Sequence, residues 1–297
     1  MHPVQLRYTD SFEEACALRD AGWEPVECAF GGHGSVLGPL AMDHHGTESH
    51  RPGVAIRAFG DAYGARAGDP RFVVTGSPDA DATLAIVGMA ALVERDSVPT
   101  DFVALVDRQD TAPIGLDLTA VPYGPWLLKF NQADLPRGER GFAGALATML
   151  SILRVGVPDE DLRHVLGKER SRLLRADKAV LGIIEPDGTE HSPEPTPPAA
   201  PPRVALVQST VWGFDRWYLW APVVVSLSTR LEKVTLGCPD RETAERLFGP
   251  GGLLAVYPSL GAGWGGREAV GGSPRGVPMT LEDARHTARK VAALLRA

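Results

Sequence analysis

Short apolar runs alternate with longer amphipathic segments along the first part of this 297-residue chain. The short runs are typical of β-strands bounded by turn residues, and they span 5–8, 25–30, 71–75 and 101–106. Segments in which apolar residues return every three or four positions predict helices over 11–21, 83–92, 142–155 and 160–176. Strands separated by helices indicate an α/β fold with a mainly parallel sheet flanked by helices.

A proline-rich segment interrupts this pattern at 186–202. Proline lacks an N–H group and favours extended polyproline II backbone, so the segment predicts a linker. It would join an N-terminal domain, 1–185, to a smaller C-terminal α/β domain, 203–297. A plain spacer and a docking motif for a partner with an aromatic groove are both compatible with this composition. Within the second domain, strand patterns cover 204–208, 223–228 and 233–236, and helix patterns cover 241–248 and 281–295.

Composition narrows the classes of partner. The chain has 30 Lys and Arg against 37 Asp and Glu, a formal charge of −7, which disfavours a protein that coats long nucleic acid through its phosphates. Three cysteines without C-x-x-C spacing indicate neither a disulfide framework nor a thiolate zinc site. No apolar run approaches the roughly 18–20 residues of a membrane span, and the start does not resemble a signal peptide. We expect a cytoplasmic protein without a membrane partner.

Side chains that bind metals follow three of the apolar runs. The run 36–42 ends in an Asp-His-His triplet, the strand 71–75 leads into an Asp-Ala-Asp loop, and the strand 101–106 ends in a single Asp. The residues concerned are Asp43, His44, His45, Asp79, Asp81 and Asp107. Because ligands bind at the carboxyl ends of parallel strands, we expect these side chains to converge at one edge of the sheet.

This set of side chains predicts a metal site. Carboxylates with a few imidazoles and no thiolates suit Mn²⁺ or Mg²⁺ better than a structural zinc ion. One or two such ions would polarise a phosphoryl oxygen and generate a hydroxide nucleophile. Plainer interpretations exist for each signal, since an Asp-x-Asp loop is often a helix cap or turn and a His pair is often a surface feature. Three signals at predicted strand ends favour a shared site.

The same motifs resemble a known family. The triplet at 43–45 resembles the signature of the DHH phosphoesterase superfamily, which includes RecJ-type nucleases, nano-RNases and family II inorganic pyrophosphatases. The strand that leads to the Asp-Ala-Asp loop at 79–81 is similar to the family's first motif, and the strand that ends at Asp107 is similar to its second. Beyond the linker, the glycine-rich stretch 261–272 resembles the substrate loop of the associated DHHA1 domain.

The resemblance implies a role for each of these positions. The metal ligands would be His44, Asp79, Asp81 and Asp107, with Asp43 as a ligand or as the partner that orients an imidazole. The catalytic positions would be His45, in contact with the substrate phosphate, and Asp107. The substrate loop would contribute Gly265, Gly266, Arg267, Gly271 and Gly272, with Arg267 as the anion-binding side chain.

The chain departs from the family pattern in several respects. The Asp-x-Asp motif follows the Asp-His-His triplet instead of preceding it, so the motif order is permuted. Thr75 stands where the family often has a histidine, and Arg267 or Glu268 stands where its substrate loop commonly has one. The candidate for a fourth carboxylate ligand is Asp110. These departures keep open a nucleotide-binding or regulatory protein with a degenerate site, and a metal-dependent hydrolase of a non-phosphate bond.

The predicted function is divalent-metal-dependent hydrolysis of a small phosphate ester, a nucleotide or a short oligonucleotide. The partner would be a small anionic substrate that contains phosphate. The aromatic cluster at 212–220 predicts the core or a homodimer contact of the smaller domain, with base stacking as the alternative.

Overall fold

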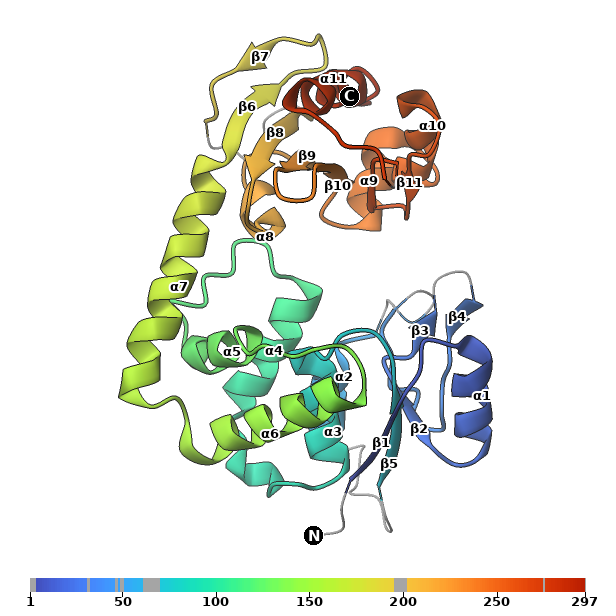
Figure 1. The fold of residues 1–297 in the computed structure, drawn as a ribbon, viewed down its shortest axis with the longest axis vertical. Helices are drawn as coiled ribbons and strands as arrows, with labels where there is room; N and C mark the ends of the chain where they lie inside the picture. The colour runs from blue at the N-terminus through green and yellow to red at the C-terminus, as the bar shows by residue number, and fades with distance from the viewer. Residues whose placement is uncertain are drawn as a thin grey trace. The chain divides into compact units, whose positions relative to one another are not determined.

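The computed structural model describes residues 4–30, 33–45, 48, 51–60, 70–194, 202–274 and 276–296, and in these ranges the chain is an α/β protein (Figure 1). It divides into two units, of which the first comprises Met1–Pro113 and Asp117–Glu169 and the second comprises Ile114–Leu116 and Arg170–Ala297. Each unit has its own sheet and core, and each is described separately.

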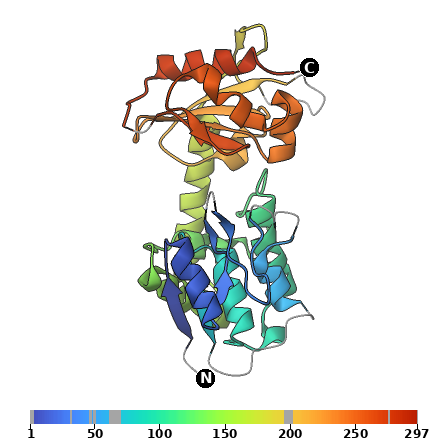
Figure 2. The same ribbon diagram turned by 90° about the vertical axis from the view of Figure 1, so that its right-hand side faces the viewer.

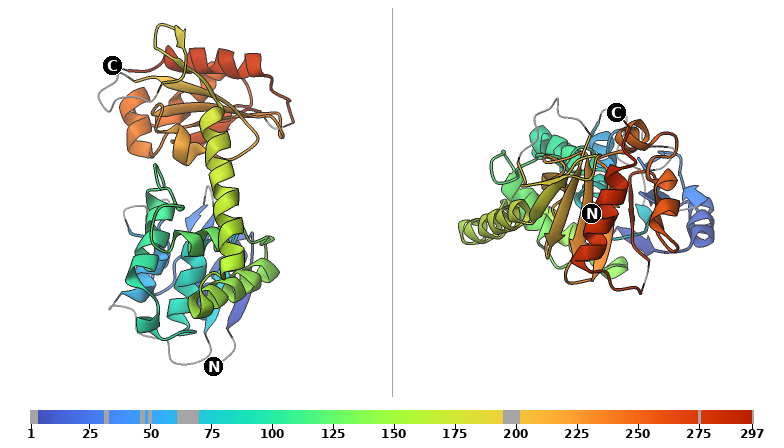
Figure 3. Two further views of the ribbon diagram at one scale, coloured as in Figure 1. Left: turned by 90° about the vertical axis from the view of Figure 1, so that its left-hand side faces the viewer. Right: turned by 90° about the horizontal axis from the view of Figure 1, so that it is seen from above.

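Elements of the first unit are β1 (Gln5–Tyr8), α1 (Phe12–Asp20), β2 (Glu24–Val26), β3 (Ala29–Phe30), β4 (Gly34–Ser35), α2 (Val54–Phe59), β5 (Arg71–Val74), α3 (Ala80–Met89), the 3₁₀ helix η3 (Arg95–Ser97), α4 (Thr100–Thr111), α5 (Gly124–Asn131) and α6 (Glu139–Val155). The helix α7 (Asp159–Lys178) spans the division between the units, and Figure 3 shows it as one uninterrupted helix.

A three-stranded parallel sheet in the order β1-β5-β2 organises the first unit. Its central strand, β5, has Phe72, Val73 and Val74 fully buried, as expected of a parallel strand covered on both faces. Helix α1 lies on one side of this sheet, and α3 and α6 lie on the other (Figures 1 and 2). Beyond β2, Met42 forms an isolated parallel bridge with Val26. The Asp-His-His triplet therefore does follow a segment that lies beside the parallel sheet.

The predicted strand at 101–106 is wrong, because this segment lies within helix α4. Its larger apolar residues are Phe102, Val103, Leu105 and Val106, and all four are buried, whereas Ala104 is exposed. Their spacing of one, three and four residues puts them on one side of a helix, whereas a strand would send alternate residues to opposite faces. Asp107 therefore lies in the middle of a helix and not at a strand end.

Elements of the second unit after α7 are β6 (Val180–Ile184), β7 (Glu190–His191), β8 (Val204–Ser209), α8 (Phe214–Trp217), β9 (Val223–Ser228), β10 (Lys233–Gly237), α9 (Arg241–Phe248), the 3₁₀ helix η4 (Gly252–Ala255), α10 (Tyr257–Leu260), β11 (Gly265–Gly266), β12 (Val270–Gly272) and α11 (Leu281–Ala292). Thr280 begins α11 with the capping box that its Asp283 completes.

The second unit is built on a seven-stranded sheet in the order β11-β12-β10-β9-β8-β6-β7. Only the pair β8–β9 is parallel among its pairings, so this sheet is mixed, and the expectation of a mainly parallel sheet is not confirmed for the chain as a whole. Along β8, Val204 and Leu206 enter the core beneath α9 and α11, while Ala205 and Val207 enter the core around α8. Figure 2 shows α11, in red, along one face of this sheet.

The domain boundary differs from the predicted one. Strands β6 and β7 precede the proline-rich segment, yet β6 pairs with β8 after it, and the division lies between Glu169 and Arg170 inside α7. The apolar run of β6 explains the difference, because Val180, Ile183 and Ile184 are buried in the second sheet. The proline-rich segment thus connects two strands of one unit, and its part at 195–201 lies outside the described residues.

Within the described ranges, no single helix is long and apolar enough to cross a membrane. Helices α6 and α7 together have the length and composition of a membrane span, but the two are bent by 120° where they meet.

Candidate metal centre

Three carboxylates of the first unit converge on the imidazole of His44. Its Nε2 lies 2.8 Å from Oε1 of Glu27, 2.7 Å from Oδ2 of Asp110 and 3.7 Å from Oδ2 of Asp81. The side chains of Glu27, His44 and Asp81 are almost fully buried, and that of Asp110 is 32% exposed. One ligand atom from each of the four lies within 4.8 Å of the others, which is close enough to hold a metal ion. We call this group the His44 cluster.

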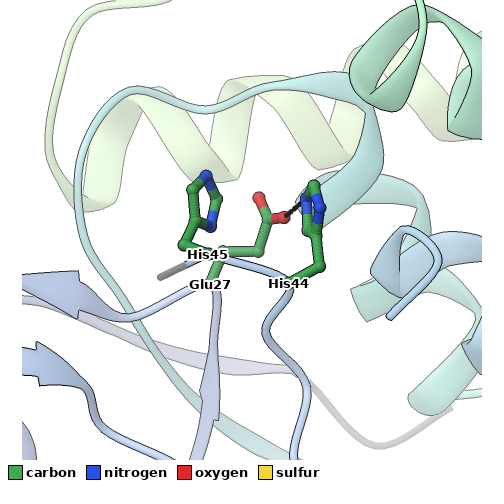
Figure 4. A group of neighbouring side chains, drawn as sticks. All are labelled: Glu27, His44 and His45. Atoms are coloured by element: carbon green, nitrogen blue, oxygen red, sulfur yellow. Dashed lines mark ion pairs between the residues drawn. The ribbon is translucent and has the colours of Figure 1, made fainter. Parts of the chain in front are cut away.

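Four different parts of the chain supply the His44 cluster. Glu27 directly follows β2, and its N–H donates to the carbonyl of Met42 at 2.9 Å, which brings it beside the Asp-His-His triplet. Asp81 is in the first turn of α3, after the central strand. Asp110 is in the last turn of α4. Figure 4 shows the carboxylate of Glu27 between the rings of His44 and His45, directed toward His44.

Two atoms at the centre of this cluster meet as an ion pair without the geometry of a hydrogen bond. Among the residues that the structure describes, Oε1 of Glu27 and Nε2 of His44 lie 2.8 Å apart and Nε2 lies 2.7 Å from Oδ2 of Asp110, but neither of the two buried atoms makes a hydrogen bond of regular geometry. Buried polar atoms are nearly always satisfied by protein, water or an ion. Ligand atoms that approach closely without hydrogen-bond geometry are the arrangement expected around a cation.

The electrostatics also favour a cation. Burial and then repulsion from Asp79 raise the pKa of Glu27 well above its ordinary value. Burial, with repulsion from Asp110 and Asp79, raises the pKa of Asp81 to about 6 against the lowering effect of its backbone hydrogen bonds. For His44, burial acts to lower the pKa, but its contacts with the carboxylates of Asp110 and Glu27 outweigh it and raise the pKa to about 10. The carboxylates therefore repel one another, and a positive charge among them relieves the repulsion.

Asp107 occupies a neighbouring position rather than the His44 cluster. Its Oδ1 accepts from the N–H of Gly53 at 2.7 Å, immediately before α2. The two oxygens of Asp81 accept from the next two N–H groups, those of Val54 at 2.7 Å and Ala55 at 2.9 Å. The predicted ligand Asp107 thus holds the start of α2, and Asp110, one helical turn later, reaches His44 instead.

Asp43 serves as the partner of an imidazole. The residue is fully buried, and its Oδ1 accepts from the N–H of His45 at 2.8 Å and lies 2.9 Å from Nδ1 of the same residue. Burial acts to raise the pKa of Asp43, but hydrogen bonds from His45 and Ser35 outweigh it and hold the pKa below its ordinary value. The ring of His45 is 42% exposed. A buried, ionised Asp43 therefore orients a solvent-accessible His45.

Asp79 has the plainer role that its sequence allows, together with an electrostatic one. Its side chain caps α3 by accepting from the N–H of Ala82 at 2.8 Å. Its charge raises the pKa of Glu27 and Asp81, and burial raises the pKa of Asp79 itself.

The five predicted residues of the substrate loop lie together in a hairpin of the second unit. Gly265 pairs with Gly272, Gly266 pairs with Gly271, and the N–H of Arg267 donates to the carbonyl of Val270 at 2.7 Å. Close packing explains two of the glycines, since a Cβ on Gly271 would lie 2.2 Å from the hydroxyl oxygen of Tyr257 and one on Gly266 would lie 2.3 Å from Cα of Gly271. Arg267 is exposed.

Sequence reasoning missed Glu27. It lies in the apolar segment 25–30, where a single acid among apolar residues is itself unusual in a buried strand. Its backbone has a φ of 51°, a left-handed conformation that non-glycine residues rarely adopt and that often marks a functional position. In the aromatic cluster, Phe214 and Trp217 belong to a buried core as predicted, while Trp212 is 67% exposed.

Comparison of the chain with known protein families, curated proteins and solved structures finds no match.

Proposed function

We propose that the His44 cluster binds a divalent cation, Mn²⁺ or Mg²⁺, and that the protein is a metal-dependent phosphoesterase. The observation that carries the proposal is the pair of buried atoms, Oε1 of Glu27 and Nε2 of His44, that approach to 2.8 Å without regular hydrogen-bond geometry in the described part of the chain. The additional carboxylates of Asp81 and Asp110 complete a donor set of three acids and one imidazole.

This donor set fits the proposed ions. Oxygen ligands with one nitrogen and no sulfur suit Mn²⁺ and Mg²⁺, whereas structural zinc sites rely on thiolates. When bound, such an ion supplies Lewis-acid polarisation of a phosphoryl oxygen and activation of water. The resembled family often has a histidine ligand at the position of Thr75, which follows β5. In this chain the ligand would come instead from Glu27, which follows the neighbouring strand β2.

His45 would contact the substrate. Because its Nδ1 is held by buried Asp43 at 2.9 Å, the ring has one orientation, and its Nε2 can hydrogen-bond a phosphoryl oxygen or transfer a proton. The preference for phosphate rests on the resemblance of the triplet 43–45 and the loop 79–81 to DHH phosphoesterases. The formal charge of −7 favours a small ester, a nucleotide or a short oligonucleotide over long nucleic acid.

A turnover assay tests this proposal. Protein treated with EDTA and then given Mn²⁺ or Mg²⁺ would be incubated with bis(p-nitrophenyl) phosphate, p-nitrophenyl phosphate, nucleotides and a short oligonucleotide. We expect metal-dependent release of product that Asp110→Asn abolishes. The matched control is Asp101→Asn, which alters an exposed acid on the same helix outside the cluster. Equal turnover in the two variants, or turnover unaffected by EDTA, would contradict the proposal.

One observation favours a second candidate. With its pKa near 10, His44 is an imidazolium in the metal-free protein and neutralises part of the acidic charge without an ion. A nucleotide-binding or regulatory protein with a degenerate site would use the cluster in this form. Such a protein would bind nucleotide without retaining Mn²⁺ and without turning over any phosphate ester.

A further inference from the structure

The side chain of Arg57 hydrogen-bonds the backbone of the segment just before His44. Arg57 is in the last turn of α2. Its Nη1 donates to the carbonyl oxygen of Ala41 at 2.8 Å, and its Nη2 donates to the carbonyl oxygen of Asp43 at 2.8 Å. A planar guanidinium can hold two acceptors in a fixed relation, which an ammonium group cannot do.

The segment that Arg57 holds is strained at Ala41, and the carbonyl oxygens of residues 41–43 are all hydrogen-bonded. Ala41 has a φ of 49°, a left-handed conformation that costs an L-residue about 1 kcal/mol or more unless its surroundings enforce it. Its three carbonyl oxygens all accept hydrogen bonds, since Arg57 bonds those of residues 41 and 43, and the N–H of Glu27 bonds that of Met42. The direction in which His44 leaves the backbone is thereby fixed.

The other end of the same helix holds the acids. The N–H groups of Val54 and Ala55 bind Asp81, and that of Gly53 binds Asp107. Helix α2 therefore joins the His44 segment, through Arg57, to the carboxylate of Asp81, which lies 3.7 Å from Nε2 of His44.

We propose that Arg57 is the positioning residue of the metal centre. By holding the carbonyls of Ala41 and Asp43, it sets the directions of His44 and His45 and the separation of His44 from Asp81. This inference rests on the proposed function for its metal readout, but the clamp itself is independent of that function. Arg57 touches neither ion nor substrate and acts through the backbone.

Helix α2 offers a matched control. Arg95 donates to the carbonyls of Gly60 and Ala58 at 3.0 Å each, at the far end of the same helix from Asp81. Arg95→Met thus removes an equivalent pair of backbone contacts from α2 without touching the segment before His44. Both arginines are half-buried, so a general loss of stability would affect the two variants alike.

The test measures Mn²⁺ affinity by calorimetry and amide hydrogen exchange over residues 41–45 in the EDTA-treated protein. We expect Arg57→Met to weaken Mn²⁺ binding by about 10- to 100-fold, the usual effect of removing a partner of a metal ligand. Arg57→Lys should fall between wild type and Arg57→Met, and Arg95→Met should leave the affinity unchanged. Exchange of the amides at 41–45 should accelerate in Arg57→Met alone.

Two results would overturn the inference: equal effects of Arg57→Met and Arg95→Met on affinity and exchange, or no effect of Arg57→Met on either. If wild type binds no Mn²⁺, the proposed function fails, and exchange decides on Arg57. Faster exchange at 41–45 in Arg57→Met, with Arg95→Met unchanged, supports the positioning role in that case, and unchanged exchange overturns it.

Discussion

The backbone at Gly53 lies against the carboxylates of Asp81 and Asp107. A Cβ added at this position would lie 2.8 Å from Oδ1 of Asp107 and 2.9 Å from both oxygens of Asp81. The φ of Gly53 is −51°, which any residue can adopt, so the need for glycine is purely one of space. We therefore predict that Gly53→Ala displaces the carboxylates of Asp81 and Asp107 or the start of α2.

The cost of this substitution follows from the contacts. Inserting a methyl group into a filled space costs about 1–3 kcal/mol, and the reduced entropy of the unfolded chain returns about 0.4–1 kcal/mol. The net loss in the free energy of unfolding is then about 1–2 kcal/mol, or roughly 2–4 °C in melting temperature for each kcal/mol in a chain of this size. Affinity for Mn²⁺ should fall as well, because the added methyl group displaces the carboxylate of Asp81, which is also a proposed metal ligand.

Thermal unfolding in EDTA and Mn²⁺ calorimetry measure the two effects. The control is Gly167→Ala in α7, where the glycine is exposed and an added Cβ meets no atom within 4 Å in the described part of the chain. This control should gain up to about 1 kcal/mol from helix propensity and leave Mn²⁺ affinity unchanged. A Gly53→Ala protein with the stability and Mn²⁺ affinity of wild type would refute the reasoning.

Three further outcomes follow from the site. Folding raises the pKa of Asp81 from 3.8 to about 6, so the metal-free folded protein should lose stability as the pH rises through about 6, and it should bind Mn²⁺ more tightly over the same rise. Melting curves in EDTA check the change in stability. Calorimetry in two buffers, which counts the protons released on binding, checks the change in Mn²⁺ affinity. Asp107→Ala should cost about 1–3 kcal/mol of stability by leaving the N–H of Gly53 unsatisfied but retain Mn²⁺ binding, whereas Asp110→Asn should lose Mn²⁺ binding. Melting curves measure the loss of stability, and calorimetry measures the loss of Mn²⁺ binding. Asp43→Asn should lower kcat and alter its pH profile with little change in Mn²⁺ affinity, because it frees the ring of His45; an unchanged profile would argue against His45 as the substrate contact.

Sequence periodicity predicted the elements in which the spacing of apolar residues fits only a helix or only a strand. The strands at 5–8 and 71–75 and most helices lie where the pattern placed them. The segment 101–106 was misassigned because it is short and mostly apolar, and helix and strand are hard to distinguish over six residues. The burial of Phe102 and Val106 on one side of α4 required the tertiary fold to be known.

For the candidate site, the sequence motifs named several residues that lie together in the structure but not all of their neighbours. His44 and Asp81 belong to the His44 cluster, His45 follows His44 directly, and buried Asp43 contacts the ring of His45. Glu27 was missed because its approach to His44 depends on a pairing between Val26 and Met42, sixteen positions apart, which no local pattern reveals. Because their segment is a helix and not a strand, Asp107 accepts from the N–H of Gly53, and Asp110 is the residue that contacts His44.

The most direct test of the account is a crystal structure of the protein soaked with Mn²⁺, with anomalous scattering data collected at the manganese edge. The account predicts an anomalous peak about 2.1 Å from Nε2 of His44 and from carboxylate oxygens of Glu27 and Asp110, near the ideal for oxygen-rich octahedral sites. A well-ordered cluster without such a peak, with His44 still bridging Glu27 and Asp110 as an imidazolium, would contradict it.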